Sequence, residues 1–176
     1  MQTPSPAARR EFPRIDGFRF AEAGDVLRGR CKVSGFRRLQ DLLNSNAGEL
    51  EYEVLGTRDE VGRPAIGIRV DGELRLTCQR CLKAMPFSLQ VNEMLVLAKN
   101  EAEIEAQPVE PEAHDRVLAG KDMEVGTLLE DEILLAIPFA PRHEHCSRSG
   151  VDKGEAQASP FEGLRGLLAR GGRARN

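Results

Sequence analysis

The stretch that decides the fold is Ile66-Gly67-Ile68-Arg69-Val70-Asp71-Gly72-Glu73-Leu74-Arg75-Leu76. Apolar and polar residues alternate on both sides of Asp71-Gly72, which is the pattern of half-buried strands. An Asp-Gly pair between two alternating runs is a strong β-hairpin signal, because both turn positions tolerate positive φ. The sequence therefore predicts two antiparallel strands joined by a turn at Asp71-Gly72.

Further strands are predicted on both sides of this stretch. Cys31 and Val33 alternate at the end of the run 26–33, and Leu50, Tyr52 and Val54 alternate with glutamates. A long run at period two follows later, with apolar residues at Phe87, Leu89, Val91, Leu95 and Leu97. Together these runs predict an antiparallel sheet of about four or five strands.

Two helices are predicted beside the sheet. Ser34 is a suitable N-cap for a short helix, because Phe36, Leu39, Leu42 and Leu43 follow at helical spacing. A second helix is predicted before Pro138, which ends it. The residues that fit this helix are Val125, Leu128, Leu129, Glu132, Ile133 and Leu135-Ala136, with the apolar ones toward the core and the acidic ones on the other face. The predicted fold class is therefore α+β, with a few helices and a candidate zinc knuckle.

The chain length of 176 residues suits one domain with a tail at each end. We expect a mobile basic arm over residues 1–14, a single α+β domain over 15–146, and a flexible basic tail over 147–176 with a short amphipathic segment. Within the domain, the Glu- and Pro-rich residues 100–116 predict a solvated acidic loop.

Composition predicts a cytoplasmic protein. No window approaches the roughly 18 consecutive apolar residues of a membrane span, and the first ten residues lack the apolar region of a secretory signal. Disulfides are rare in the cytoplasm, so the four cysteines are interpreted as reduced thiols or metal ligands.

The cysteines give the clearest chemical signal. Cys78 and Cys81 are separated by two residues, so their thiolates can chelate one ion from a tight turn. His143 and Cys146 have the same spacing and can supply the second half of a zinc site, with His145 as the alternative histidine. The competing interpretation is two reduced cysteines at a strand end with surface histidines. Cys31 has no partner at ligand spacing and is expected in the core.

Charge is distributed in blocks. Residues 1–40 hold nine Lys/Arg against four Asp/Glu, and residues 101–132 hold two against eleven. The basic residues can contact phosphates, or can simply form a solvated surface. The candidate nucleic-acid-binding residues are Arg28, Arg30, Lys32, Arg37, Arg38, Arg80 and Lys83.

Enzymatic function is not indicated. The sequence contains no Gly-rich phosphate loop, no Gly-x-Ser-x-Gly elbow and no HExxH helix. A thioredoxin-like role needs a helix after the CxxC motif, whereas Pro86 and the alternating residues after it predict a strand. We therefore predict a non-enzymatic protein.

Several blocks in this order resemble the bacterial YceD family, whose members are called large ribosomal RNA subunit accumulation proteins. They are residues 76–83 with the CxxC motif, the acidic run 130–138 ending in Pro138, residues 141–146, and Ser159-Pro160-Phe161 before the basic end. The resemblance covers roughly residues 20–170. It places the family's cysteine knuckle on Cys78 and Cys81 and its second cluster on His143, His145 and Cys146. Some relatives have more cysteines after the proline, so the fourth ligand stays open.

The resemblance implies a ribosome-biogenesis factor that supports synthesis, processing or stability of large-subunit (23S) ribosomal RNA. In this hypothesis the basic residues contact the phosphates of ribosomal RNA or its precursor. The alternative is a protein-binding adaptor, in which the acidic segment 101–132 engages a basic ribosomal protein and affects the RNA indirectly. The small number of aromatic residues slightly favours the adaptor, because readers of single-stranded RNA usually stack bases on aromatic rings.

Overall fold

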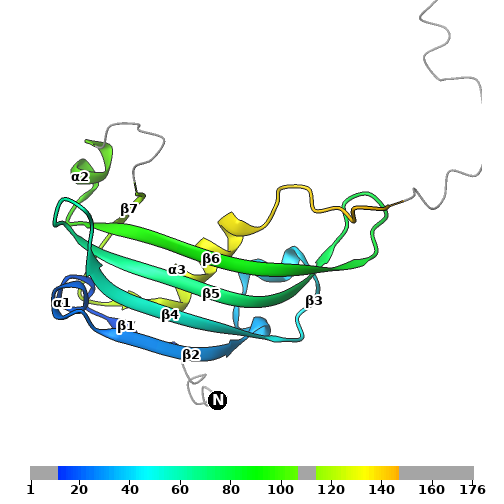
Figure 1. Ribbon diagram of the computed structural model, residues 1–176, viewed down its shortest axis with the longest axis horizontal. Coiled ribbons are helices and arrows are strands. Elements are labelled where there is room, and N and C mark those ends of the chain that lie inside the picture. Colours follow the sequence, from blue (N-terminus) through cyan, green and yellow to red (C-terminus); the bar gives the residue numbers. More distant parts are fainter. Residues whose placement is uncertain (1–11, 107–113, 147–176) are drawn as a thin grey trace, which may run out of the picture.

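The computed structural model describes residues 12–106 and 114–146. It confirms the α+β fold class: one face of a large, mostly antiparallel sheet is covered by a helix (Figure 1). In chain order the elements are β1 (Arg14–Ile15), α1 (Gly17–Ala23), β2 (Val26–Lys32), the 3₁₀ turns η1 (Val33–Gly35) and η2 (Arg38–Asp41), β3 (Leu43–Ser45), β4 (Glu49–Arg58), β5 (Pro64–Thr77), β6 (Ala84–Ala98), α2 (Glu101–Glu105), β7 (Arg116–Leu118), β8 (Met123–Glu124) and α3 (Val125–Ala136).

The main sheet has six strands in the order β2-β4-β5-β6-β7, and β3 pairs with the part of β5 that lies beyond the start of β4. All pairs are antiparallel except β6–β7, which is parallel. β1 and β8 form a separate antiparallel pair. The strands predicted around residues 26–33, 50–54 and 87–97 are confirmed as β2, β4 and β6.

The predicted turn at Asp71-Gly72 is wrong. β5 runs without interruption from Pro64 to Thr77, and Asp71 pairs with Glu51 on one side and Gln90 on the other. Residues 66, 68, 70, 74 and 76 are all buried, so the chain keeps one alternation through the Asp-Gly pair. A two-residue turn would have placed residues 70 and 73 on the same face and shifted that alternation.

Gly72 has a packing role instead. A Cβ atom at this position would lie 2.5 Å from Cδ2 of Leu50 on β4. Glycine therefore permits the close approach of the fully buried Leu50 side chain across the strand.

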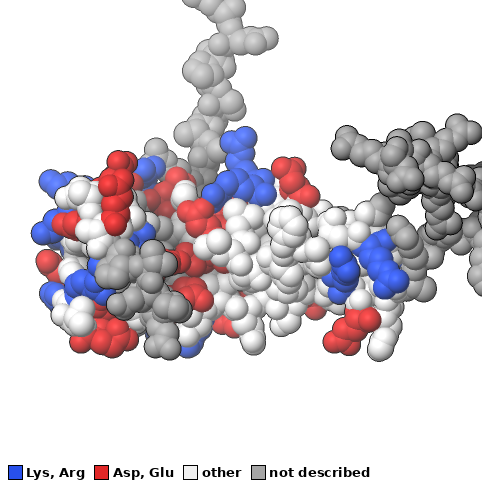
Figure 2. Space-filling view, turned by 90° about the horizontal axis from the view of Figure 1, so that it is seen from above, with Lys and Arg blue, Asp and Glu red and all other residues white. Residues whose placement is uncertain are grey.

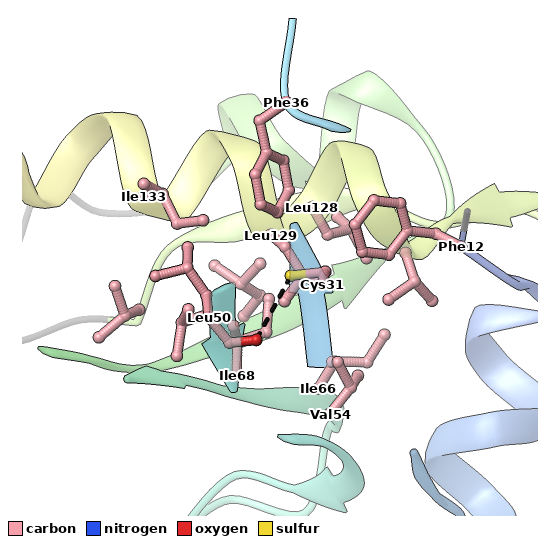
Figure 3. Close-up of a cluster of buried hydrophobic side chains, with 14 of the residues drawn as sticks. Phe12, Cys31, Phe36, Leu50, Val54, Ile66, Ile68, Leu128, Leu129 and Ile133 are labelled. Atoms are coloured by element: carbon pink, nitrogen blue, oxygen red, sulfur yellow. Dashed lines mark hydrogen bonds between the residues drawn. The ribbon is translucent and has the colours of Figure 1, made fainter. Parts of the chain in front are cut away.

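The core lies between the inner face of the sheet and α3 (Figure 3). Phe36, Leu50, Ile68, Leu129 and Ile133 are almost completely buried there. Cys31 is 4% exposed and its thiol lies 3.7 Å from the Leu50 carbonyl oxygen, which confirms the predicted core position. At one end of the sheet α1 packs so closely on β4 that a Cβ atom at Gly56 would lie 2.0 Å from the Phe20 carbonyl oxygen.

The predicted helix after Ser34 is replaced by η1 and η2, and Ser34 caps neither of them. Phe36 and Leu39 are buried as their spacing indicated, whereas Leu42 is 41% exposed. A continuous helix is excluded because the chain must return to the sheet at Leu43, where β3 pairs with β5.

The predicted helix before Pro138 is confirmed as α3, but Leu135 does not face the core. Leu135 is 74% exposed, whereas Glu132 is only 8% exposed. The side chain of Leu135 leaves the core because α3 meets the sheet chiefly through Val125, Leu128, Leu129 and Ile133.

The segment 100–116 is not one solvated loop. The Asn100 side chain accepts a hydrogen bond from the Glu103 N–H at 3.0 Å and caps α2, and β7 begins at Arg116. Residues 107–113 lie outside the described residues.

Of the predicted arm, residues 1–11 lie outside the described residues, as does the predicted tail 147–176. Phe12 is buried, with its ring centroid 5.4 Å from that of Phe36, and Arg14 belongs to β1. In the described ranges, 12–106 and 114–146, no helix is long and apolar enough to cross a membrane.

Candidate metal centre

The CxxC motif forms the tight connection between the two longest strands, β5 and β6. The Cys78 N–H donates to the Lys83 carbonyl at 2.9 Å, and the Leu82 N–H donates to the Cys78 carbonyl at 2.9 Å. Leu82 completes the turn with φ 59°, a value that L-residues rarely adopt. A strand follows the motif, as predicted, so the helix start that activates a redox cysteine is absent at this turn.

A second segment, which follows α3, lies over this connection. The Gln79 N–H donates to the Pro141 carbonyl at 2.9 Å and joins two parts of the chain that are 62 residues apart. Pro141 is buried at this contact. The hydrogen bond brings His143 and Cys146 to the cysteine pair.

Cys78, Cys81, His143 and Cys146 converge, and their ligand atoms all lie within 4.8 Å of one another. The sulfurs of Cys78 and Cys146 are 3.8 Å apart, and the Cys81 sulfur is 3.5 Å from Nδ1 of His143. Zn–S bonds of about 2.3 Å and Zn–N bonds of about 2.0 Å in a tetrahedron require S–S and S–N separations of about 3.8 and 3.5 Å. The two measured distances therefore fit a tetrahedral ion.

The orientation of His143 also suits a ligand. Its Nε2 lies 3.1 Å from the Ala84 carbonyl oxygen, which can only accept a hydrogen bond. This contact favours the tautomer that carries its proton on Nε2 and leaves the Nδ1 lone pair directed at the cluster. A backbone carbonyl in this role is a common outer partner of metal-binding histidines.

The electrostatics of the cluster differ between its thiols. Burial of Cys78 would raise its pKa, but the backbone N–H groups of Cys81, Arg80 and His143 outweigh burial and lower the pKa to about 5. Hydrogen bonding to the sulfur of Cys81, burial and the neighbouring Cys78 raise the pKa of Cys146 to about 11. The cluster therefore favours the thiolate of Cys78 and disfavours a second thiolate at Cys146. A bound cation would stabilise both thiolates.

The structure brings together the four residues that were predicted as metal ligands. His145, the alternative ligand, is exposed and does not belong to the cluster. The backbone hydrogen bond between Gln79 and Pro141 could not be found from spacing, although it aligns the two halves.

The predicted phosphate-binding residues fall into two groups. Arg28 and Arg30 on β2 form ion pairs with Glu53 and Glu51 on β4, and Arg38 pairs with Glu130 and Asp131 on α3. Lys32 and Arg37 are exposed near the end of the same sheet edge.

Arg80 and Lys83 form the second group, at the knuckle itself. Both are exposed, and neither forms an ion pair with any residue in the described ranges. Arg142, which the sequence analysis did not single out, is also exposed beside the cluster. Figure 2 shows Lys and Arg side chains at the end of the molecule that carries this turn.

The described residues of the acidic segment 101–132 lie on α2, β7, β8 and α3 and in the stretches between them, and Glu130 and Asp131 form ion pairs with Arg38. Glu132 lies close to Glu93, Asp115 and Asp131, so carboxylates from β6, from α3 and from the stretch before β7 gather at one place.

These features define a small α+β protein with a cluster of three cysteines and one histidine that could hold a metal ion. The cluster joins the turn between β5 and β6 to the segment that follows α3. A family model described as "Large ribosomal RNA subunit accumulation protein YceD" matches residues 66–168, which is more than half of the chain. The chain belongs to the YceD family, and the resemblance is confirmed. No solved structure matches it.

Proposed function

We propose that this protein is a non-enzymatic ribosome-biogenesis factor that supports the synthesis, processing or stability of 23S ribosomal RNA. The observation that carries the proposal is the family match over residues 66–168, which contains all four residues of the candidate metal centre. The family's description names accumulation of large-subunit ribosomal RNA, not a reaction.

A structural zinc ion is the proposed occupant of the centre. Three thiols and an imidazole are ligands that zinc prefers, and four protein ligands complete a tetrahedron. Catalytic zinc sites instead keep one position open for water or substrate. The ligand set therefore supports a role in holding the knuckle in place, in keeping with a non-enzymatic protein.

The proposed contact surface for RNA is the knuckle with its exposed cations, Arg80 and Lys83. These side chains are held on a rigid turn and have no carboxylate partner in the described part of the chain. Arg28 and Arg30 are less suited to phosphates, since each already pairs with a glutamate. Contacts of this kind are mostly independent of sequence and sensitive to salt.

The function is tested by depleting the protein from the cells that make it and measuring ribosomal RNA. We expect a selective fall in mature 23S relative to 16S RNA, restored by the wild type but not by Cys78→Ser/Cys81→Ser. Cys31→Ala is the matched control, because Cys31 lies in the core and outside the cluster. Unchanged 23S RNA and unchanged subunit ratios after depletion would refute the proposal.

The RNA surface is tested separately with Arg80→Gln/Lys83→Gln and a transcript of precursor large-subunit RNA. Loss of two phosphate contacts should weaken binding about tenfold near physiological salt and make its salt dependence shallower by about 1.5 logarithmic units per decade. Arg28→Gln/Arg30→Gln removes the same charge and is expected to change affinity by less than about twofold. Equal losses in the two double variants would argue against a site at the knuckle.

A further inference from the structure

One edge of the main sheet is only partly covered. β6 pairs with β5 from Ala84 to Val96, whereas on its other side it pairs with β7 only from Val96 to Ala98. No residue in the described ranges, 12–106 and 114–146, pairs with that side of β6 between Ala84 and Leu95. An uncovered strand edge can accept another strand.

The hydrogen-bonding groups on this edge can be assigned from its covered end. The Val96 N–H donates to the Asp115 carbonyl at 2.8 Å, and the Ala98 carbonyl accepts from the Ala119 N–H at 2.9 Å. The register of β6 is uninterrupted, and alternate residues of a strand direct their N–H and C=O groups to the same edge. The residues with groups on the free edge are therefore Ser88, Gln90, Asn92 and Met94.

Pro86 lies an even number of residues before Ser88, so its nitrogen also faces this edge, and proline has no N–H group. Proline is accepted in a sheet where its nitrogen needs no ladder partner. Its position thus limits the accessible edge to the part of β6 that follows it.

A groove runs along the free edge, between β6 and α3. It has a volume of about 330 Å³ and is lined by Gln90, Val91 and residues 93–95 from the strand. Consecutive residues of a strand point to opposite faces of the sheet. A groove lined by consecutive residues of β6 therefore lies along the edge of the sheet and not on one of its faces. From the helix side Glu132, Leu135 and Ala136 contribute.

The groove contains an unpaired acid. Glu132 is 8% exposed and forms no hydrogen bond or ion pair with another residue in the part of the chain that the structure describes. Burial raises its pKa, and the nearby Glu93, Asp115 and Asp131 raise it further. No fully buried side-chain oxygen in the described ranges lacks a hydrogen-bond partner, so the Glu132 carboxylate reaches solvent in the groove, where a cation would stabilise its charged form. The exposed Leu135 lies beside it as an apolar contact.

We propose that this groove binds an extended peptide segment of a partner protein, which adds to β6 as a strand and directs a lysine or arginine side chain to Glu132. The backbone groups on the free edge supply the affinity of strand addition, and the acid selects the cation. The groove repels phosphates, so it is a surface distinct from the proposed RNA contact, and peptide binding measured without RNA tests it independently.

The probe is the peptide Ser-Val-Thr-Lys-Thr-Val-Ser, blocked at both ends, with Glu in place of Lys as the control peptide. In an added strand the lysine and both valines of this peptide lie on the same face. The lysine can therefore enter the groove while the valines form the apolar contacts beside it. With the full-length protein we expect the lysine peptide to bind at least tenfold more tightly than the glutamate peptide. Hydrogen exchange at Gln90, Asn92 and Met94 should be fast in the free protein and slower on binding.

Glu132→Gln and, separately, the exposed Glu93→Gln should each reduce the affinity of the lysine peptide about fivefold to tenfold. Glu73→Gln is the matched control, since Glu73 is exposed on β5 and lies outside the groove. This variant should bind the lysine peptide as tightly as the wild type does. The proposal is overturned if both peptides bind equally or neither binds at about 1 mM. It is also overturned if these amides are protected in the free protein, because the tail 147–176 or a second copy would then cover the edge.

Discussion

Replacing Cys78 with serine is expected to empty the metal centre. Protein purified without chelators should contain one zinc ion per chain, whereas Cys78→Ser should contain almost none, because Cys78 is buried within the four-ligand cluster. The loss should also lower the melting temperature by about 10 °C, since binding of a structural metal contributes directly to folding. Elemental analysis and thermal unfolding measure the two effects.

Cys31→Ala is the control for this substitution. Cys31 is equally a buried cysteine, but it belongs to the core between the sheet and α3 and should retain full metal content. The histidines give a second comparison: His143→Ala should lose the metal, and His145→Ala, at an exposed position outside the cluster, should keep it. A zinc-free wild type that also fails to bind added zinc or cobalt would refute the site.

Replacing Leu129 with alanine is expected to lower the free energy of unfolding by about 3 kcal/mol, within the range of about 2–5 kcal/mol for large cavities in well-packed cores. Leu129 is completely buried between α3 and the sheet (Figure 3). Neighbouring side chains are held by both layers and can close the cavity only partly. Urea denaturation measures the change.

Leu135→Ala on the same helix is the matched control. Leu135 is 74% exposed, so its truncation should change the free energy of unfolding by no more than about 0.5 kcal/mol. Equal losses at the two positions would mean that α3 is rotated relative to the sheet. The comparison therefore tests which face of α3 is buried, the point on which the sequence prediction was partly wrong.

The alternation of apolar residues predicted β2, β4 and β6, and the same alternation could have shown that the predicted turn at Asp71-Gly72 was wrong. Residues 66–76 keep apolar residues at even positions on both sides of Asp71-Gly72, which a two-residue turn does not allow. An Asp-Gly pair indicates only that the local backbone is able to form a tight turn. The neighbouring strands β4 and β6 decide that the chain continues straight, because each pairs with β5 at Asp71.

The metal ligands were predictable because chelation depends on short spacing. The pairs Cys78/Cys81 and His143/Cys146 each have two intervening residues, and the structure brings the two pairs together. The choice between His143 and His145 needed the tertiary structure. Only there does the Ala84 carbonyl lie beside His143, on a strand 59 residues earlier in the chain.

By itself the amino-acid sequence determined the α+β class, the strands β2, β4 and β6, the existence of α3 and the ligand pairs, since period and spacing are properties of neighbouring residues. The tertiary structure decided that Glu132 is buried while Leu135 is exposed, that Arg28 and Arg30 are paired, and that one edge of β6 is open between Ala84 and Leu95 in the described part of the chain. Burial, pairing and an open edge depend on which distant segments meet, and local periodicity carries no information about those contacts.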